Sequence, residues 1–199
     1  MARLPPDLQT LQDALDVAER DARALVDGLT EAQGTWRADA GSWSVAECLD
    51  HLATSNVVYL AAMRPGAVRA RTNGRRRRRA AEPGLVGGWF VRYLEPPVSS
   101  RFKSKAPRKI RPRVGPALAD AFTSFIASQG DVRDFLRTYA DIDLAGVRFE
   151  NPFIRGVRFS LATGLHVIAA HERRHLWQAW RVRRAAEGAT AQSFRLSAH

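Results

Sequence analysis

The chain has 199 residues, of which 45% are hydrophobic, and a formal net charge of +11 at pH 7. This length allows one domain with a core of its own, so stability does not have to come from disulfides. Cys48 is the only cysteine, which excludes an intrachain disulfide and fits a reducing compartment, so we expect a cytoplasmic protein. The N-terminus has no apolar signal-peptide segment and the longest apolar stretch is about ten residues, so we predict neither a secretion signal nor a membrane span and expect no membrane partner.

The first two predicted elements are long helices. Residues 8–29 place leucine and alanine side chains three and four positions apart, the period of a helix with one buried stripe. Ser44 followed by Glu47 is the pattern of a capping box and predicts the start of a second helix. We expect this second helix to stop before Pro65, because proline removes a backbone donor inside a helix.

Two further helices are predicted in the second half of the chain. The third begins after Pro116 and reaches about residue 139, and Gly130 is expected to kink or break it. The fourth covers about residues 160–187 and is expected to end at Gly188. The predicted fold class is therefore all-α, a four-helix bundle with a long connection between the second and third helices. We expect residues 1–199 to form a single domain.

The connection at about residues 69–113 is strongly basic. It contains fifteen Lys and Arg against two Glu, a net +13, so the rest of the chain sums to −2. The run Arg75–Arg79 is expected to be solvated and mobile because its like charges repel one another. Residues 85–94 are apolar enough to form a short helix or strand that packs on the bundle.

Three histidines form the clearest candidate site. His171 and His175 are four positions apart, about 40° around a helix, so both imidazoles face the same way. His166 lies about 140° from His171 and cannot join them. His51, in the second predicted helix, would be the third member. Three neutral imidazoles from two packed helices can hold a divalent metal with open coordination positions, whereas the alternative is histidines that only hydrogen-bond in the core.

The chain resembles the DinB-like superfamily, which includes YfiT-type metal proteins and several low-molecular-weight-thiol-dependent transferases and isomerases. The resemblance covers most of residues 8–187 and rests on Trp43, Asp50-His51-Leu52, Asn151-Pro152-Phe153 and His171-x-x-x-His175-x-x-Gln178. It implies a four-helix bundle that binds a divalent metal, most often nickel or zinc, through His51, His171 and His175. It also implies a homodimer and a low-molecular-weight thiol as a second cofactor.

The leading functional hypothesis is a metal-dependent enzyme that acts on a small molecule. A metal with open positions acidifies bound water or a bound thiol, so either hydrolysis or thiol-dependent transfer would follow. A rival interpretation is a zincin protease, because residues 171–175 fit the HExxH motif with Glu172 as general base. That interpretation lacks a recognisable third ligand, since only Glu187 and His199 follow, and Glu172 is expected to point away from the ligand face.

Two interpretations without catalysis remain open. The basic segment 69–113 could bind polyanions such as nucleic acid through non-specific, salt-sensitive phosphate contacts. Alternatively, the protein could be a stress-associated or interaction protein whose histidines are vestigial. Near the site, Cys48 is expected to be a buried apolar residue and Gln178 to support a ligand or to pack.

Overall fold

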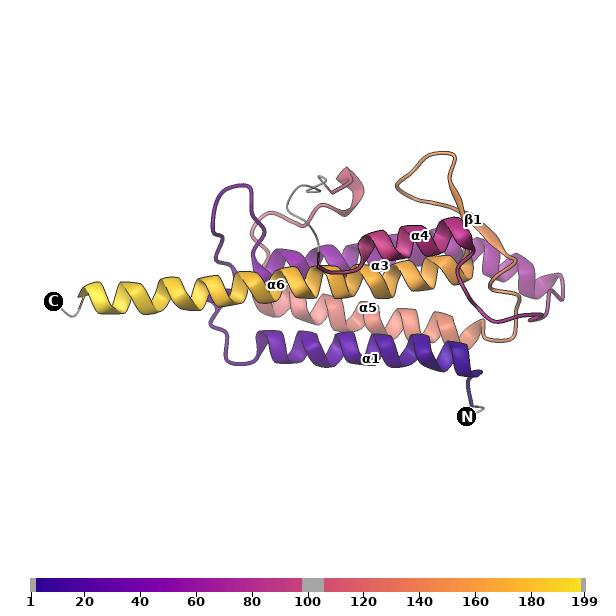
Figure 1. The fold of residues 1–199 in the computed structure, drawn as a ribbon, viewed down its shortest axis with the longest axis horizontal. Helices are drawn as coiled ribbons and strands as arrows, with labels where there is room; N and C mark the ends of the chain where they lie inside the picture. Colours follow the sequence, from indigo (N-terminus) through magenta and orange to yellow (C-terminus); the bar gives the residue numbers. More distant parts are fainter. Residues whose placement is uncertain (1–2, 98–105, 198–199) are drawn as a thin grey trace.

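The structure is a computed structural model that describes residues 3–97 and 106–197, with side chains up to residue 189. Four long helices run side by side: α1 (Pro6–Val26), α3 (Val45–Thr72), α5 (Leu118–Thr138) and α6 (Leu161–Ser197) (Figure 1). Shorter elements are α2 (Glu31–Gly34), α4 (Leu85–Leu94) and the 3-10 helix η2 (Arg108–Ile110). The predicted four-helix bundle is confirmed. No helix in the described ranges is long and apolar enough to cross a bilayer.

Helix α3 begins where the sequence predicts and ends later. The Ser44 hydroxyl accepts a hydrogen bond from the Glu47 amide at 3.1 Å, and the Glu47 carboxylate accepts one from the Ser44 amide at 2.9 Å. The predicted stop before Pro65 is wrong, because the helix continues to Thr72. Met63 and Ala67, on either side of the proline, are fully buried. Their packing offsets the lost backbone hydrogen bond, a defect that costs about 3 kcal/mol in an isolated helix.

Two predicted helix breaks at glycine are also wrong. α5 passes through Gly130 without interruption, and α6 passes through Gly188 to Ser197. In the described part of the chain the left-handed conformation that ends many helices occurs at Gly28, Gly74, Gly115 and Gly156, and Gly188 does not adopt it. A glycine inside a helix costs only about 1 kcal/mol of stability relative to alanine, so tertiary packing determines whether the helix continues.

A small β-hairpin, absent from the all-α prediction, joins α5 to α6. Strands β1 (Arg148–Glu150) and β2 (Arg158–Ser160) are antiparallel, with Phe149 opposite Phe159. The Asn151 side chain accepts hydrogen bonds from the amides of Phe153 and Ile154 and so shapes the turn. β2 leads directly into α6, so the hairpin fixes where the last helix starts.

The core contains a hydrophobic cluster shared by all four long helices. Leu25, Leu49, Phe125 and Leu176 are fully buried in it. Leu49 and Leu176 lie within two positions of His51 and His175, so this cluster surrounds the half of the bundle that carries the candidate site.

The arginine run at residues 75–79 is held to the bundle by acids that are distant in the sequence. Arg75 and Arg79 lie within 4 Å of Asp143, and Arg76 bonds Asp141. Arg77, which is partly buried, makes two hydrogen bonds to Asp7 at 2.6 and 2.7 Å. The arginines other than Arg77 are exposed, so the run is solvated as expected. Their ion pairs offset the like-charge repulsion on which the expectation of a mobile run rested. Part of the predicted basic connection, including Arg101, Lys103 and Lys105, lies outside the described residues.

Candidate metal centre

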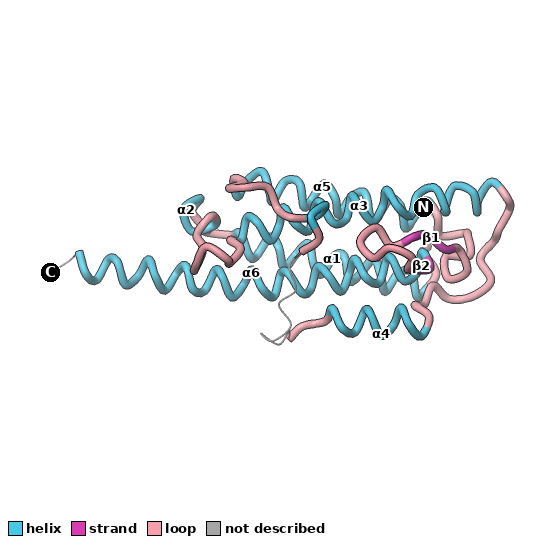
Figure 2. The backbone as a smooth tube through the Cα atoms, turned by 90° about the horizontal axis from the view of Figure 1, so that it is seen from above, coloured by secondary structure: helices cyan, strands magenta, loops and turns pink. Residues whose placement is uncertain are grey.

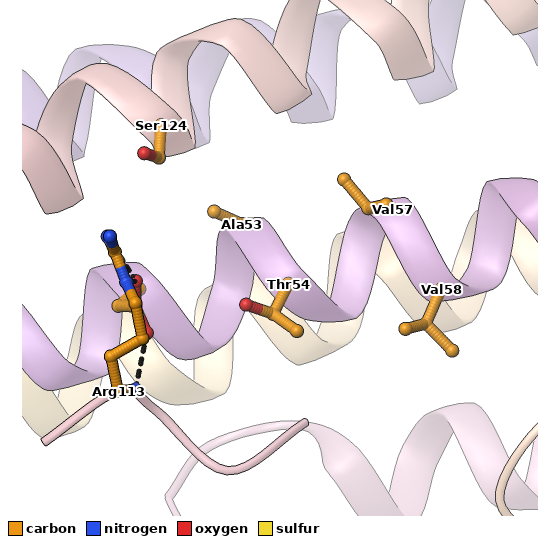
Figure 3. A pocket seen from close by; sticks show the side chains of 7 residues that line it. Ala53, Thr54, Val57, Val58, Arg113 and Ser124 are labelled. Carbon is orange, nitrogen blue, oxygen red and sulfur yellow. Dashed lines mark hydrogen bonds and ion pairs between the residues drawn. The ribbon is translucent and has the colours of Figure 1, made fainter. Parts of the chain in front are cut away.

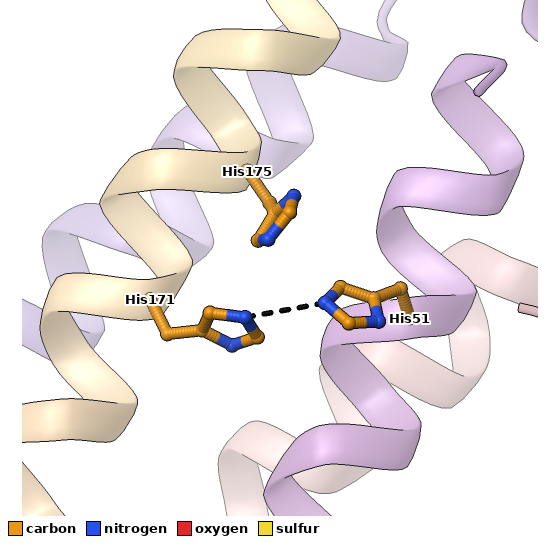
Figure 4. A group of neighbouring side chains, drawn as sticks. All are labelled: His51, His171 and His175. Atoms are coloured by element: carbon orange, nitrogen blue, oxygen red, sulfur yellow. Dashed lines mark hydrogen bonds between the residues drawn. The ribbon is translucent and has the colours of Figure 1, made fainter. Parts of the chain in front are cut away.

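The three predicted histidines meet between α3 and α6. One ring nitrogen from each of His51, His171 and His175 lies within 4.8 Å of the other two. The Nε2 atoms of His51 and His171 are 3.2 Å apart. His51 projects from α3 toward the two imidazoles of α6 (Figure 4). This group could hold a metal ion.

Hydrogen bonds at the far ring nitrogens orient two of the three imidazoles. His51 Nδ1 contacts the Ile110 carbonyl oxygen of η2 at 2.5 Å. A carbonyl can only accept, so Nδ1 carries the proton and the His51 Nε2 lone pair faces His171. His175 Nδ1 lies 3.1 Å from the Gln178 side-chain oxygen, which orients that ring in the same manner. Such outer partners fix the tautomer and direction of metal-binding histidines.

Burial keeps the imidazoles neutral. His51 is 1% exposed and His175 is 9% exposed. Burial lowers the pKa of His51 to about 4, although the Ile110 carbonyl and Asp50 oppose the shift. The pKa values of His171 and His175 are also held well below the ordinary range, by burial first and by the neighbouring histidines second. At neutral pH all three rings therefore have a lone pair available for a cation.

Trp43 forms an aromatic wall of the site. Its ring centroid is 4.7 Å from that of His51 and 5.6 Å from that of His175. The residue stands just before the capping box of α3, so the turn that starts the helix also places the indole over the imidazoles. Trp180, by contrast, donates to Asp21 at 2.8 Å, away from the histidines.

Glu172 is not a member of the histidine group. Its side chain is fully buried and accepts a hydrogen bond from the Asn56 amide at 2.9 Å. Burial raises the pKa of Glu172 to about 7, against the hydrogen bond from Asn56 and the positive charges of Arg133 and Arg173. As predicted, the Glu172 side chain points away from the histidine ligands. It lies in the core against α3 and α5, where a substitution lowers the stability of the fold. Among the described residues none completes a zincin arrangement, since Glu187 pairs with Arg183. His199 lies outside the described residues.

Other side chains near the site have structural partners. His166 contacts the Ala81 carbonyl at 3.0 Å, so it stays apart from the triad as expected. Cys48 is fully buried, and burial raises the pKa of its thiol. Glu47 completes the capping box and also pairs with Arg37. Sequence reasoning missed Ile110, because a backbone acceptor leaves no trace in residue type.

A surface hollow lies on another face of α3. It is lined by Asp50, Ala53, Thr54, Val57, Val58, Arg113 and Ser124 (Figure 3). The Asp50 carboxylate accepts hydrogen bonds from the backbone amide and the guanidinium of Arg113 at 2.8 and 2.7 Å. The hollow contains none of the three histidines, so the candidate chemistry belongs to the triad.

Comparison with known proteins identifies a family. The family described as the DinB superfamily matches residues 14–179, which include all three histidines. No curated protein and no solved structure matches the chain significantly.

Proposed function

The chain belongs to the DinB superfamily, and on that premise we propose that it is a divalent-metal enzyme whose ligands are His51, His171 and His175. The metal we expect is nickel or zinc, since imidazole nitrogen suits both. The substrate is a small molecule, and the reaction is hydrolysis or transfer that uses a low-molecular-weight thiol.

The observation that carries the proposal is the direction of the His51 lone pair. Because the Ile110 carbonyl holds the proton on Nδ1, Nε2 has only a lone pair to offer the His171 nitrogen at 3.2 Å. Without a metal, a proton on His171 Nε2 fills this contact as a hydrogen bond (Figure 4), whereas a cation between the two nitrogens would accept a lone pair from each. A third imidazole of the same kind, His175, faces the same space, and a single proton cannot serve all three nitrogens.

The surrounding residues perform two tasks. The Ile110 carbonyl and Gln178 hold the far nitrogens, so the near nitrogens stay unprotonated and aimed inward. Trp43 and the buried leucines on either side exclude water from the rear of the site. A bound divalent cation would lower the pKa of a water molecule or thiol bound at its open coordination positions. It would also stabilise negative charge that develops in the reaction.

The test is metal content and turnover of untagged protein. Wild-type protein is expected to retain close to one equivalent of metal, while His51→Ala and His175→Ala lose it. His166→Ala is the matched control, because it removes a histidine from α6 that lies outside the group. Turnover is then measured on ester, amide and thiol-conjugation substrates. Equal metal content in all four proteins would refute the site, and retained metal without turnover would refute the enzymatic part.

A further inference from the structure

Helix α4 lies outside the four-helix bundle, along α6 (Figure 2). Its inner face is closely packed. A side chain at Gly87 would come within 2.5 Å of the Thr163 hydroxyl of α6, and the Phe90 ring centroid is 5.3 Å from that of Phe159 in β2. The helix is thus held in one orientation on the bundle, and its opposite face must point outward.

That opposite face is apolar. Leu85 is 96% exposed, Val86 is 73% exposed and Trp89 is 63% exposed. The three positions fall within an arc of about 100° on a helix, and we call them the α4 outer face. The Trp89 ring also stacks on Tyr93, with centroids 6.0 Å apart. Adjacent exposed apolar side chains of this size usually mark an interaction surface.

The surroundings of the α4 outer face are cationic. Arg92 of α4 is exposed, and the Arg174 guanidinium of α6 lies 6.0 Å from the centroid of the Tyr93 ring. Glu95, at the end of α4, is paired with Arg173, which reduces its repulsion of an anionic partner. The segment 69–113 carries +13 in the sequence, and it stays net positive although several of its arginines pair with aspartates elsewhere in the chain, so a partner must tolerate or use positive charge.

Charge and residue type together select one kind of partner. A second copy of the chain would bring two cationic faces together, which opposes association. Single-stranded nucleic acid would use stacking on Trp89, but the aliphatic Leu85 and Val86 have no such role. An anionic lipid surface uses both features, since aliphatic and indole side chains enter the headgroup boundary while arginines contact phosphates.

We propose that the α4 outer face binds the surface of anionic lipid membranes, with Leu85, Val86 and Trp89 inserted at the headgroup boundary. The expectation of no membrane partner came from hydropathy, which detects spanning segments. A ten-residue helix lying flat on a bilayer escapes that criterion.

The test is co-sedimentation of the full chain with phosphatidylcholine vesicles and with mixed phosphatidylcholine–phosphatidylglycerol vesicles. Wild-type protein is expected to bind the mixed vesicles and to release as salt rises. Leu85→Ser with Trp89→Ser should weaken binding about tenfold or more. The matched control is Val17→Ser with Val57→Ser, which changes two similarly exposed apolar residues on α1 and α3, and it should bind like wild type. Trp emission should shift to the blue on binding in wild type but not in Trp89→Phe.

Three outcomes would overturn the proposal. If the Leu85/Trp89 variant binds the mixed vesicles as tightly as wild type does, charge alone accounts for binding. The same conclusion follows if the variant keeps wild-type affinity for both duplex DNA and the mixed vesicles. A dimer that the same variant dissociates in sedimentation experiments would identify a second copy as the occupant. Absence of binding to the mixed vesicles would exclude a lipid partner.

Discussion

The histidine centre and the arginine run at residues 75–79 handle polar groups in opposite ways. At the centre, imidazoles that are buried or partly buried are neutral and share a space that could hold a cation. In the run, permanently charged guanidiniums stay near the surface and pair with Asp7, Asp141 and Asp143. The comparison teaches that side chains which can become neutral, such as histidine, are tolerated in the interior. Arginine stays charged, so it remains near the surface and forms ion pairs with carboxylates from other parts of the fold.

The largest effect on stability is expected at Glu172, beside the histidine centre. Glu172→Ala should lower the free energy of unfolding by about 2–3 kcal/mol, because the buried Asn56 amide then loses its acceptor in the core. Glu172→Gln keeps an acceptor for Asn56 and should cost less. Urea unfolding of both variants gives the comparison. If metal content falls in Glu172→Ala while its stability is unchanged, the carboxylate is a ligand and its placement in the core is wrong.

The next effect is expected at Gln178, which orients His175. Gln178→Ala should weaken metal binding by about 10–100-fold while leaving the thermal midpoint of the metal-free protein nearly unchanged, as for other outer partners of metal-binding histidines. Competition with a chelator measures the affinity. Arg181→Ala, which removes a side chain from the same stretch of α6 that lies over Trp177, is the control and should retain wild-type affinity. Equal affinities would show that the contact with Gln178 does not set the ring orientation.

A smaller effect is expected in the arginine run. Arg77→Ala should cost about 1–2 kcal/mol, because Arg77 makes two hydrogen bonds to a partly buried carboxylate. Arg78→Ala alters an exposed neighbour of the same charge and should stay within about 0.5 kcal/mol of wild type. Thermal unfolding of the two variants distinguishes an anchored run from a mobile one. Equal midpoints would show that the pairing of Arg77 with Asp7 does not anchor the run.

The smallest effect concerns the pH dependence of that same contact. Burial by itself raises the pKa of Asp7, but hydrogen bonds from Arg77 and the Ala81 amide outweigh it, and the net pKa is lowered from the ordinary 3.8. The contribution to stability is therefore complete above that value and is lost as pH falls through the lowered pKa. The stability difference between wild type and Arg77→Ala should be constant near neutral pH and shrink below about pH 4. A difference that grows in acid would contradict the sign.

The sequence predicted the features that depend on local period. Helical spacing placed His171 and His175 on one face, and the capping box located the start of α3. Prediction from the sequence failed where residues distant in the chain determine the local structure. Packing on both sides of Pro65 extends α3, aspartates from two separate segments hold the arginine run, and a backbone carbonyl at Ile110 fixes His51. None of these contacts has a local sequence pattern, because each depends on the final arrangement of the helices.

The contact between His51 and Ile110 joins the histidine centre to the basic connection at residues 69–113. Ile110 belongs to η2, inside the basic connection, yet its carbonyl determines which nitrogen of His51 is free. Any partner that displaces η2 would release this constraint and lower the affinity of the triad for a cation. By thermodynamic reciprocity, a cation held at the triad would oppose displacement of η2 by the same factor. Occupancy of the interior and the conformation of the charged surface segment are thereby coupled through one hydrogen bond.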